Sequence, residues 1–161
     1  MRRPLKLVHL SRTTTANARP SRAARRWGSF PTTADVGIWA TGATANALLE
    51  GLALGLFAVM TDLRRVRPRE ERAVSASAED TPALVVSFLT ELIVLQQTEG
   101  FLVRTATVRS VGRPPTSLIA ALSGERFDPT RHVARTEVKA VTFHDLEFDP
   151  ERRRARVILD I

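Results

Sequence analysis

The spacing of apolar residues changes near residue 100, and this change limits the folds that the chain can adopt. Over residues 45–60 and 84–95 apolar residues recur every three or four positions, the spacing of one helical face. Residues 101–111, 117–123, 137–148 and 152–161 instead read as strands. With further strands expected near residues 36–39 and 73–78, the pattern predicts an α+β domain in the order β-α-β-α-β-β-β-β, with two helices packed on largely antiparallel sheet layers.

Local residues predict where these elements begin, end and pack. Gly51 and Gly55 lie four residues apart and therefore on one helical face, which predicts close packing of this helix against a sheet. The second helix should begin with Thr81 as its N-cap and end at Gly100. Turns are expected at residues 112–115, 124–125 and 149–150.

The charge of the chain is concentrated at its start. Of the 161 residues, the first 27 contain eight of the 24 Lys and Arg and no acidic residue, so the rest is close to neutral despite the net charge of +7. This composition predicts a disordered basic tail over residues 1–27 and a folded domain over residues 28–161. A transit peptide or a polyanion-binding arm would have a similar composition. We expect no membrane span, because the strongest apolar run, near residues 52–60, is too short.

Few residues offer catalytic chemistry. The chain has no Cys, which excludes thiolate nucleophiles, disulfides and cysteine-ligated zinc. No phosphate-binding loop, dinucleotide-binding motif or nucleophile elbow occurs. His144, Asp145 and Lys139 could form an acid–base group, but neighbouring residues of a regular strand point to opposite faces, so His144 is interpreted as structural or as part of an interface.

Two carboxylates remain as candidates for a metal site. Asp35 precedes the first expected strand, and Asp160 lies in the last one beside the main-chain oxygen of Ile161. Hard divalent cations bind such oxygen ligands. Aspartates in turns and near chain ends are more often solvated or bonded to nearby backbone, so this spacing alone does not indicate a metal.

Three blocks of sequence are similar to the archease family. They are residues 33–38 (TADVGI), 137–144 (EVKAVTFH) and 157–161 (VILDI). The order of elements between the blocks also matches, including residues 57–62 (FAVMTD), 88–92 (FLTEL) and the stretch from Gly124 to His132. The resemblance covers about residues 28–161.

The resemblance implies a non-enzymatic protein that activates an RtcB-type RNA ligase. Such a ligase joins RNA ends through a guanylylated intermediate, in tRNA splicing or RNA repair. By matching position, the family's divalent metal site falls on Asp35, Asp160 and the main-chain oxygen of Ile161, with Ca²⁺ as the expected ion. Lys139 and His144 are candidates for ligase contact or for structural roles. We expect the ligase as partner, RNA indirectly through it, no membrane, no small-molecule substrate and a cytoplasmic location.

Two features depart from the family pattern, and one leads to an alternative function. Thr32 stands where the family commonly has His, and the basic tail lies outside the usual domain. If the tail bound RNA phosphates, the chain would be a basic-tailed RNA-binding module with salt-sensitive affinity. A small metal-dependent enzyme is a third reading, but it would need a nucleophile or general base that the sequence does not reveal.

Overall fold

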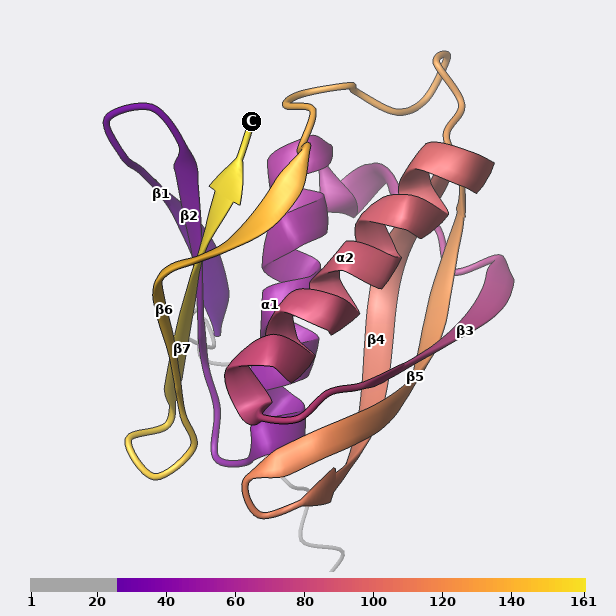
Figure 1. The fold of residues 1–161 in the computed structure, drawn as a ribbon. Helices are drawn as coiled ribbons and strands as arrows, with labels where there is room; N and C mark the ends of the chain where they lie inside the picture. Colours follow the sequence, from indigo (N-terminus) through magenta and orange to yellow (C-terminus); the bar gives the residue numbers. More distant parts are fainter. Residues whose placement is uncertain (1–25) are drawn as a thin grey trace, which may run out of the picture.

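The computed structural model describes residues 26–161, which form two antiparallel sheets with both helices packed between them (Figure 1). One sheet has the strand order β1-β2-β7-β6 and the other β3-β5-β4. The elements are β1 (Trp27–Pro31), β2 (Val36–Thr41), α1 (Ala45–Met60), the 3-10 helix η1 (Leu63–Arg65), β3 (Glu70–Ser77), α2 (Thr81–Glu99), β4 (Phe101–Gly112), β5 (Pro115–Arg126), β6 (Ala140–Asp149) and β7 (Arg154–Asp160). The predicted α+β class with two helices on antiparallel sheet is confirmed.

The predicted element order missed one strand. Residues 27–31 form β1, which pairs with β2 in register from Trp27 opposite Ala40 to Pro31 opposite Val36. Pro31 and Gly28 have low strand propensity, so the sequence did not predict a strand here. Both residues are tolerated because β1 is an edge strand. The domain therefore includes Trp27, one residue before the expected boundary. The predicted tail otherwise falls on residues 1–25, outside the described residues.

Helix α1 packs against one sheet through its glycines, as predicted. A Cβ atom on Gly51 would lie 2.8 Å from the Ala40 Cβ, and one on Gly55 would lie 3.5 Å from the Ile38 Cβ. The absence of side chains at both positions lets the helix approach β2 closely. Thr44 caps the helix by accepting a hydrogen bond from the Ala47 N–H at 3.1 Å.

The other side of α1 covers the free edge of β4. The Glu50 Oε1 accepts a hydrogen bond from the Val108 N–H at 2.9 Å, and the Asn46 Oδ1 accepts one from the Ser110 N–H at 3.0 Å. These two side chains satisfy N–H groups that an edge strand would otherwise leave unpaired. The two polar residues within an apolar helix thus have a structural role.

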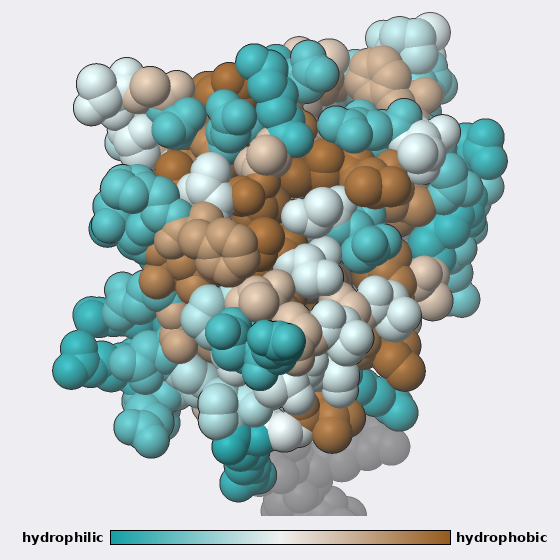
Figure 2. All heavy atoms as spheres, viewed as in Figure 1, coloured by the Kyte–Doolittle hydropathy of each residue, from teal (hydrophilic) through white to brown (hydrophobic). Residues whose placement is uncertain are grey.

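Helix α2 begins one residue earlier than the predicted cap implied. Asp80, not Thr81, is the N-cap, and its side chain accepts a hydrogen bond from the Ala83 N–H at 2.8 Å. Gly100 ends the helix with φ at 64°, as expected. By length and composition α2 could cross a membrane, but its apolar stripe, which includes Phe88 and Leu92, is part of the core. In Figure 2, which shows the molecule from the same side as Figure 1, apolar residues are visible near the middle of the surface, with hydrophilic residues around them.

The strand boundaries in the second half differ most from the predictions where strand geometry is irregular. The expected turn at Gly124 and Glu125 is instead the last part of β5. The strand predicted from residue 137 begins at Ala140, because residues 127–139 form a long loop across the end of the domain (Figure 1). In strand β7, Leu159 is buried and Asp160 exposed, as predicted, but Ile158, which was expected on the face of Asp160, is buried as well.

Candidate functional site

The pairing of β2 with β7 brings Asp35 and Asp160 together. Val36 lies opposite Leu159 in this antiparallel register, Asp35 directly precedes Val36, and Asp160 directly follows Leu159. Both aspartates therefore lie at the same end of the sheet. This end also carries the β1–β2 turn and the last residues of β7, at the top of Figure 1.

Hydrogen bonds of the main chain fix this end of the sheet. The Asp35 N–H donates to the Thr32 Oγ1 at 3.0 Å, and the Thr32 N–H donates to the Asp35 carbonyl at 3.1 Å, which closes the turn. Thr32 thus has a local structural role at the position where the resemblance led us to expect His. The Lys139 N–H donates to the Asp160 carbonyl at 2.8 Å, and its Nζ donates to the Ile161 oxygen at 3.3 Å.

The prediction that His144 and Asp145 cannot share one site is wrong. The register of β6 against β7 is shifted between Thr142 and Glu147, so the strand does not alternate regularly there, and Asp145 has a positive φ of 50°. The His144 Nε2 lies 3.3 Å from the Asp145 Oδ2. Both residues line one cavity of about 310 Å³ together with Asp35.

The remaining walls of this cavity include Arg156 and Ile158 of β7. The Arg156 guanidinium lies 4.9 Å from the centre of the Phe30 ring and 3.8 Å from the Asp145 Oδ2. Arg156 thus partly balances the charge of Asp145. The structure places His144 in one cavity with Asp35, and the Lys139 Nζ on the main-chain oxygen of Ile161.

The oxygens of Asp35 and Asp160 remain available to a ligand. Among residues 26–161, neither carboxylate accepts a hydrogen bond or forms an ion pair, whereas those of Asp62, Glu125 and Asp145 all have cationic partners. Two carboxylates and a main-chain oxygen are hard donors suited to Ca²⁺. The described residues contain no group of three or more His, Cys, Asp or Glu placed to hold a metal, so the Ile161 oxygen and water would have to supply further ligands.

A second polar cluster, formed by Arg67, Glu125, Arg131 and His132, was not predicted from the sequence. The Glu125 Oε1 accepts hydrogen bonds from the Arg67 N–H at 3.0 Å and from the His132 Nε2 at 2.8 Å, and the Arg131 Nη2 lies 2.6 Å from it. The His132 Nδ1 accepts the Asp128 N–H at 2.8 Å, so the ring proton is on Nε2. Arg67 lies 58 residues from Glu125 in the sequence and His132 lies 7 residues after it, and neither spacing is a motif from which the cluster could be predicted.

The pKa of Glu125 reflects this environment. Burial of the carboxylate acts to raise its pKa, but the hydrogen bonds from Arg131, the Arg67 N–H and His132 together outweigh burial and lower the pKa to about 2. Glu125 is 5% exposed and stays charged. The cluster therefore holds the start of loop 127–139 against β5 and the segment after η1.

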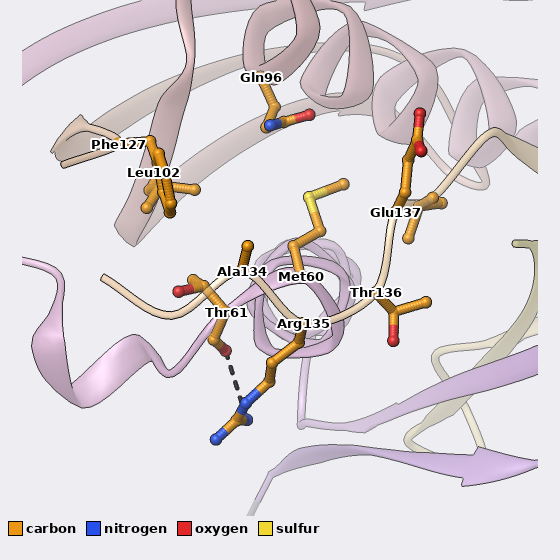
Figure 3. Close-up of a pocket in the computed structure, with 10 residues that line it drawn as sticks. Met60, Thr61, Gln96, Leu102, Phe127, Ala134, Arg135, Thr136 and Glu137 are labelled. Carbon is orange, nitrogen blue, oxygen red and sulfur yellow. Dashed lines mark hydrogen bonds between the residues drawn. The ribbon is translucent and has the colours of Figure 1, made fainter. Parts of the chain in front are cut away.

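The same loop covers the end of α1. The Arg135 N–H donates to the Met60 carbonyl at 2.9 Å, and the Thr61 Oγ1 donates to the Val133 carbonyl at 2.7 Å. Between this loop, α1 and α2 lies a cavity of about 240 Å³, with Met60 and Gln96 among the residues that line it (Figure 3). These contacts make the loop a fixed part of the domain.

This fold and this pair of free carboxylates define a small α+β domain with an acidic end. The chain matches the Archease protein family (MTH1598/TM1083) over residues 27–161, and it belongs to that family. It is 42% identical to the protein archease of Thermococcus gammatolerans over 126 residues, which are 78% of this chain and 89% of the relative. It is 38% identical over 135 residues to the protein archease of Methanothermobacter thermautotrophicus, covering 82% and 96%.

Solved structures support the same fold. The solution structure of Methanobacterium thermoautotrophicum protein 1598 matches with a TM-score of 0.69 and 34% identity, over 85% of this chain and 99% of that one. The crystal structure of TM1083 from Thermotoga maritima, described as an archease and possible chaperone, matches with a TM-score of 0.55 over 82% and 94%. At 19% identity the latter likeness concerns the fold alone.

Proposed function

We propose that this archease is a non-catalytic activator of an RtcB-type RNA ligase in the cytoplasm. Its acidic end, defined as Asp35, Asp160 and the main-chain oxygen of Ile161, would contact the ligase. The observation that carries the proposal is the β2–β7 register, which brings together two carboxylates that have no partner within residues 26–161. The chain belongs to the archease family, and the choice of a ligase as partner rests on what the sequence resemblance implied.

The residues of the acidic end would hold one divalent cation, which we propose to be Ca²⁺. When bound, such an ion would supply positive charge that attracts phosphate oxygens. The turn closed by Thr32 orients Asp35, and the hydrogen bond from the Lys139 N–H orients the backbone of Asp160. The Lys139 Nζ competes with a cation for the Ile161 oxygen, so cation binding would require this side chain to move or share the oxygen.

The partner-facing surface would extend from the acidic end to the irregular part of β6. His144 and Asp145 protrude there, with side chains 77% and 60% exposed, and they line the cavity that Asp35 also lines. Phe143 is 61% exposed beside them. A ligase that contacted the carboxylates would therefore meet this segment as well. RNA would be engaged through the ligase, and no small-molecule substrate is proposed.

A ligation assay with the cognate RtcB-type ligase at limiting concentration tests this proposal. Asp35→Asn and Asp160→Asn should each remove most of the stimulation, because each deletes one of two charged ligands. Glu151→Ala is a matched control, since it removes an exposed carboxylate from the β6–β7 turn at the other end of the sheet. Full stimulation by the Asp35→Asn, Asp160→Asn double variant would refute the proposed role of the acidic end. RNA joining by the purified protein alone would refute its non-catalytic role.

A further inference from the structure

Strand β4 carries an arginine, Arg104, that has no counter-charge among residues 26–161. Val103 pairs with Gly124 and Thr105 pairs with Ser123, so Arg104 is an extra residue without a partner in the β5 ladder. Such a bulge changes the direction of a side chain and often lies beside a binding site. The bulge depends on Gly124, because a Cβ atom there would lie 1.8 Å from the Leu102 carbonyl oxygen.

The position of Arg104 follows from the packing of α1 along β4. Asn46 bonds to Ser110 and Glu50 bonds to Val108, so helix and strand run side by side. From Glu50, two more turns of α1 advance about 12 Å, and four residues of β4 advance about 13 Å. This brings Ala58 level with Arg104, and both line the same cavity. The Glu50 side chain reaches β4 and accepts a hydrogen bond from it, whereas the short side chain of Ala58 leaves a cavity beside Arg104.

We name this cavity the arginine pocket and define it by Trp27, Ala58, Asp62, Arg64, Arg104 and Arg135. It has a volume of about 370 Å³. Among the described residues, Asp62 is the only acidic one that lines the pocket. Arg64 binds both of its carboxylate oxygens, at 3.0 and 2.9 Å. The side-chain hydrogen bond from Arg64 is the main cause that lowers the pKa of Asp62 to about 2. Asp62 is thus engaged by Arg64.

The two other arginines have N–H donors without a partner among residues 26–161. Arg135 extends away from Met60 and Gln96 toward the Thr61 carbonyl, which its Nη1 approaches to 3.5 Å (Figure 3). Its Nη2 is 4.0 Å from Asp62. Arg104 forms no hydrogen bond or ion pair with any residue between 26 and 161. The described lining residues include three guanidinium groups and one carboxylate, a net charge of +2.

We propose that the arginine pocket binds a phosphate group of a single-stranded RNA. Guanidinium groups match phosphate oxygens in geometry as well as charge, and Arg104 and Arg135 both line this cavity. Trp27 forms another part of the wall, and an aromatic ring beside a phosphate site suits base stacking. The end of α1 lies at the same end of the domain as the acidic end in Figure 1, so RNA held there would be near the proposed ligase contact.

The proposal does not depend on the ligase and is tested without it. The full chain is titrated with a 3′-phosphorylated oligouridylate, and binding is followed by tryptophan fluorescence, since Trp27 lines the pocket. Arg104→Gln should weaken binding about tenfold and reduce the salt dependence by about 0.7 in logarithmic slope. Ala58→Glu should weaken binding at least as much by pairing with Arg104. Arg109→Gln removes an exposed arginine from the same strand and should leave affinity nearly unchanged.

Parallel titrations identify the source of the phosphate. RNA binding that depends on Arg104 and is not displaced by millimolar inorganic phosphate or GTP would support the proposal. Binding of GTP or inorganic phosphate, but not RNA, through Arg104 would overturn the assignment to RNA. Equal RNA affinity and salt slope in wild type, Arg104→Gln and Ala58→Glu would overturn the site itself and assign any RNA binding to other residues. Thermal melts verify that each variant is folded.

Discussion

Removing the carboxylate of Glu125 should destabilise the domain because this group orders the start of loop 127–139. In Glu125→Ala, the Arg67 N–H and the His132 Nε2–H lose their acceptor, at about 1–1.5 kcal/mol each. The Arg131 side chain is 29% exposed and can turn to water, so its loss should add less than about 1 kcal/mol. The expected decrease in the free energy of unfolding is about 3 kcal/mol.

A second variant separates hydrogen bonding from charge. All three short contacts reach the same oxygen, Oε1, and Glu125→Gln can keep an oxygen there. We expect Glu125→Gln to lose about 1 kcal/mol, mainly from the weaker interaction with Arg131. The reasoning requires the order wild type, Gln, Ala in decreasing stability.

Urea unfolding at pH 7, followed by tryptophan fluorescence, measures these differences. A loss of about 3 kcal/mol corresponds to a decrease of about 10 °C in Tm for a domain of this size. Glu151→Ala is the control, because this exposed residue has no partner among residues 26–161 and should change stability by less than about 0.5 kcal/mol. A loss below about 1 kcal/mol in Glu125→Ala would show that loop 127–139 does not depend on the cluster.

Three other perturbations have outcomes that follow from the structure. The pKa of Glu125 is lowered from 4.5 to about 2, so its contribution to stability is present above pH 4.5 and is lost as the pH falls toward 2. Stability should therefore fall more in wild type than in Glu125→Gln between pH 4.5 and 2, while the loss that comes from Asp62 remains in both. Gly124→Ala should cost about 3 kcal/mol or more in urea unfolding, because its Cβ would collide with the Leu102 carbonyl; an effect below 1 kcal/mol would contradict the bulge. Ca²⁺ at about 100 times its Kd should stabilise wild type by about 2.7 kcal/mol, and Asp160→Asn should lose this effect. Lys139→Gln should bind Ca²⁺ more tightly, because the Lys139 Nζ no longer occupies the Ile161 oxygen. Equal Ca²⁺ affinity of all three proteins by calorimetric titration would contradict cation binding at the acidic end.

Regular patterns in the sequence were sufficient to predict the helices, most strands and the outward direction of Asp160. Apolar spacing depends directly on helix and strand geometry, and Gly51 and Gly55 indicated a sheet contact that the structure confirms. Strand β1 was not predicted, because it lacks a clear alternation of apolar residues and contains Gly28 and Pro31, which an edge strand tolerates. The boundaries of loop 127–139 were predicted wrongly, with a turn at residues 124–125 and a strand from residue 137, because the contact between Glu125 and His132 that holds the loop has no signal in the local spacing.

The acidic end could be proposed from the sequence only through the resemblance to archeases. Nothing in the spacing of Asp35 and Asp160 indicates that they are neighbours, because strand pairing over this separation depends on the complete sheet order β1-β2-β7-β6. The structure supplies that order, together with the observation that both carboxylates lack partners in the described part of the chain.

Two departures from regular strand pairing concern residues with functional proposals, and they share one physical cause. Regular alternation assigns each side chain to a face, whereas an extra residue in one strand reverses that assignment. In β6 the shift between Thr142 and Glu147 brings His144 and Asp145 together beside Asp35. In β4 the register shift falls at Arg104, whose side chain lines the arginine pocket. Both shifts remove ladder pairs, a cost in stability that regular strands would avoid, and both place polar groups toward the end of the domain that carries Asp160. Irregular strand geometry at this end is therefore better explained by binding than by folding.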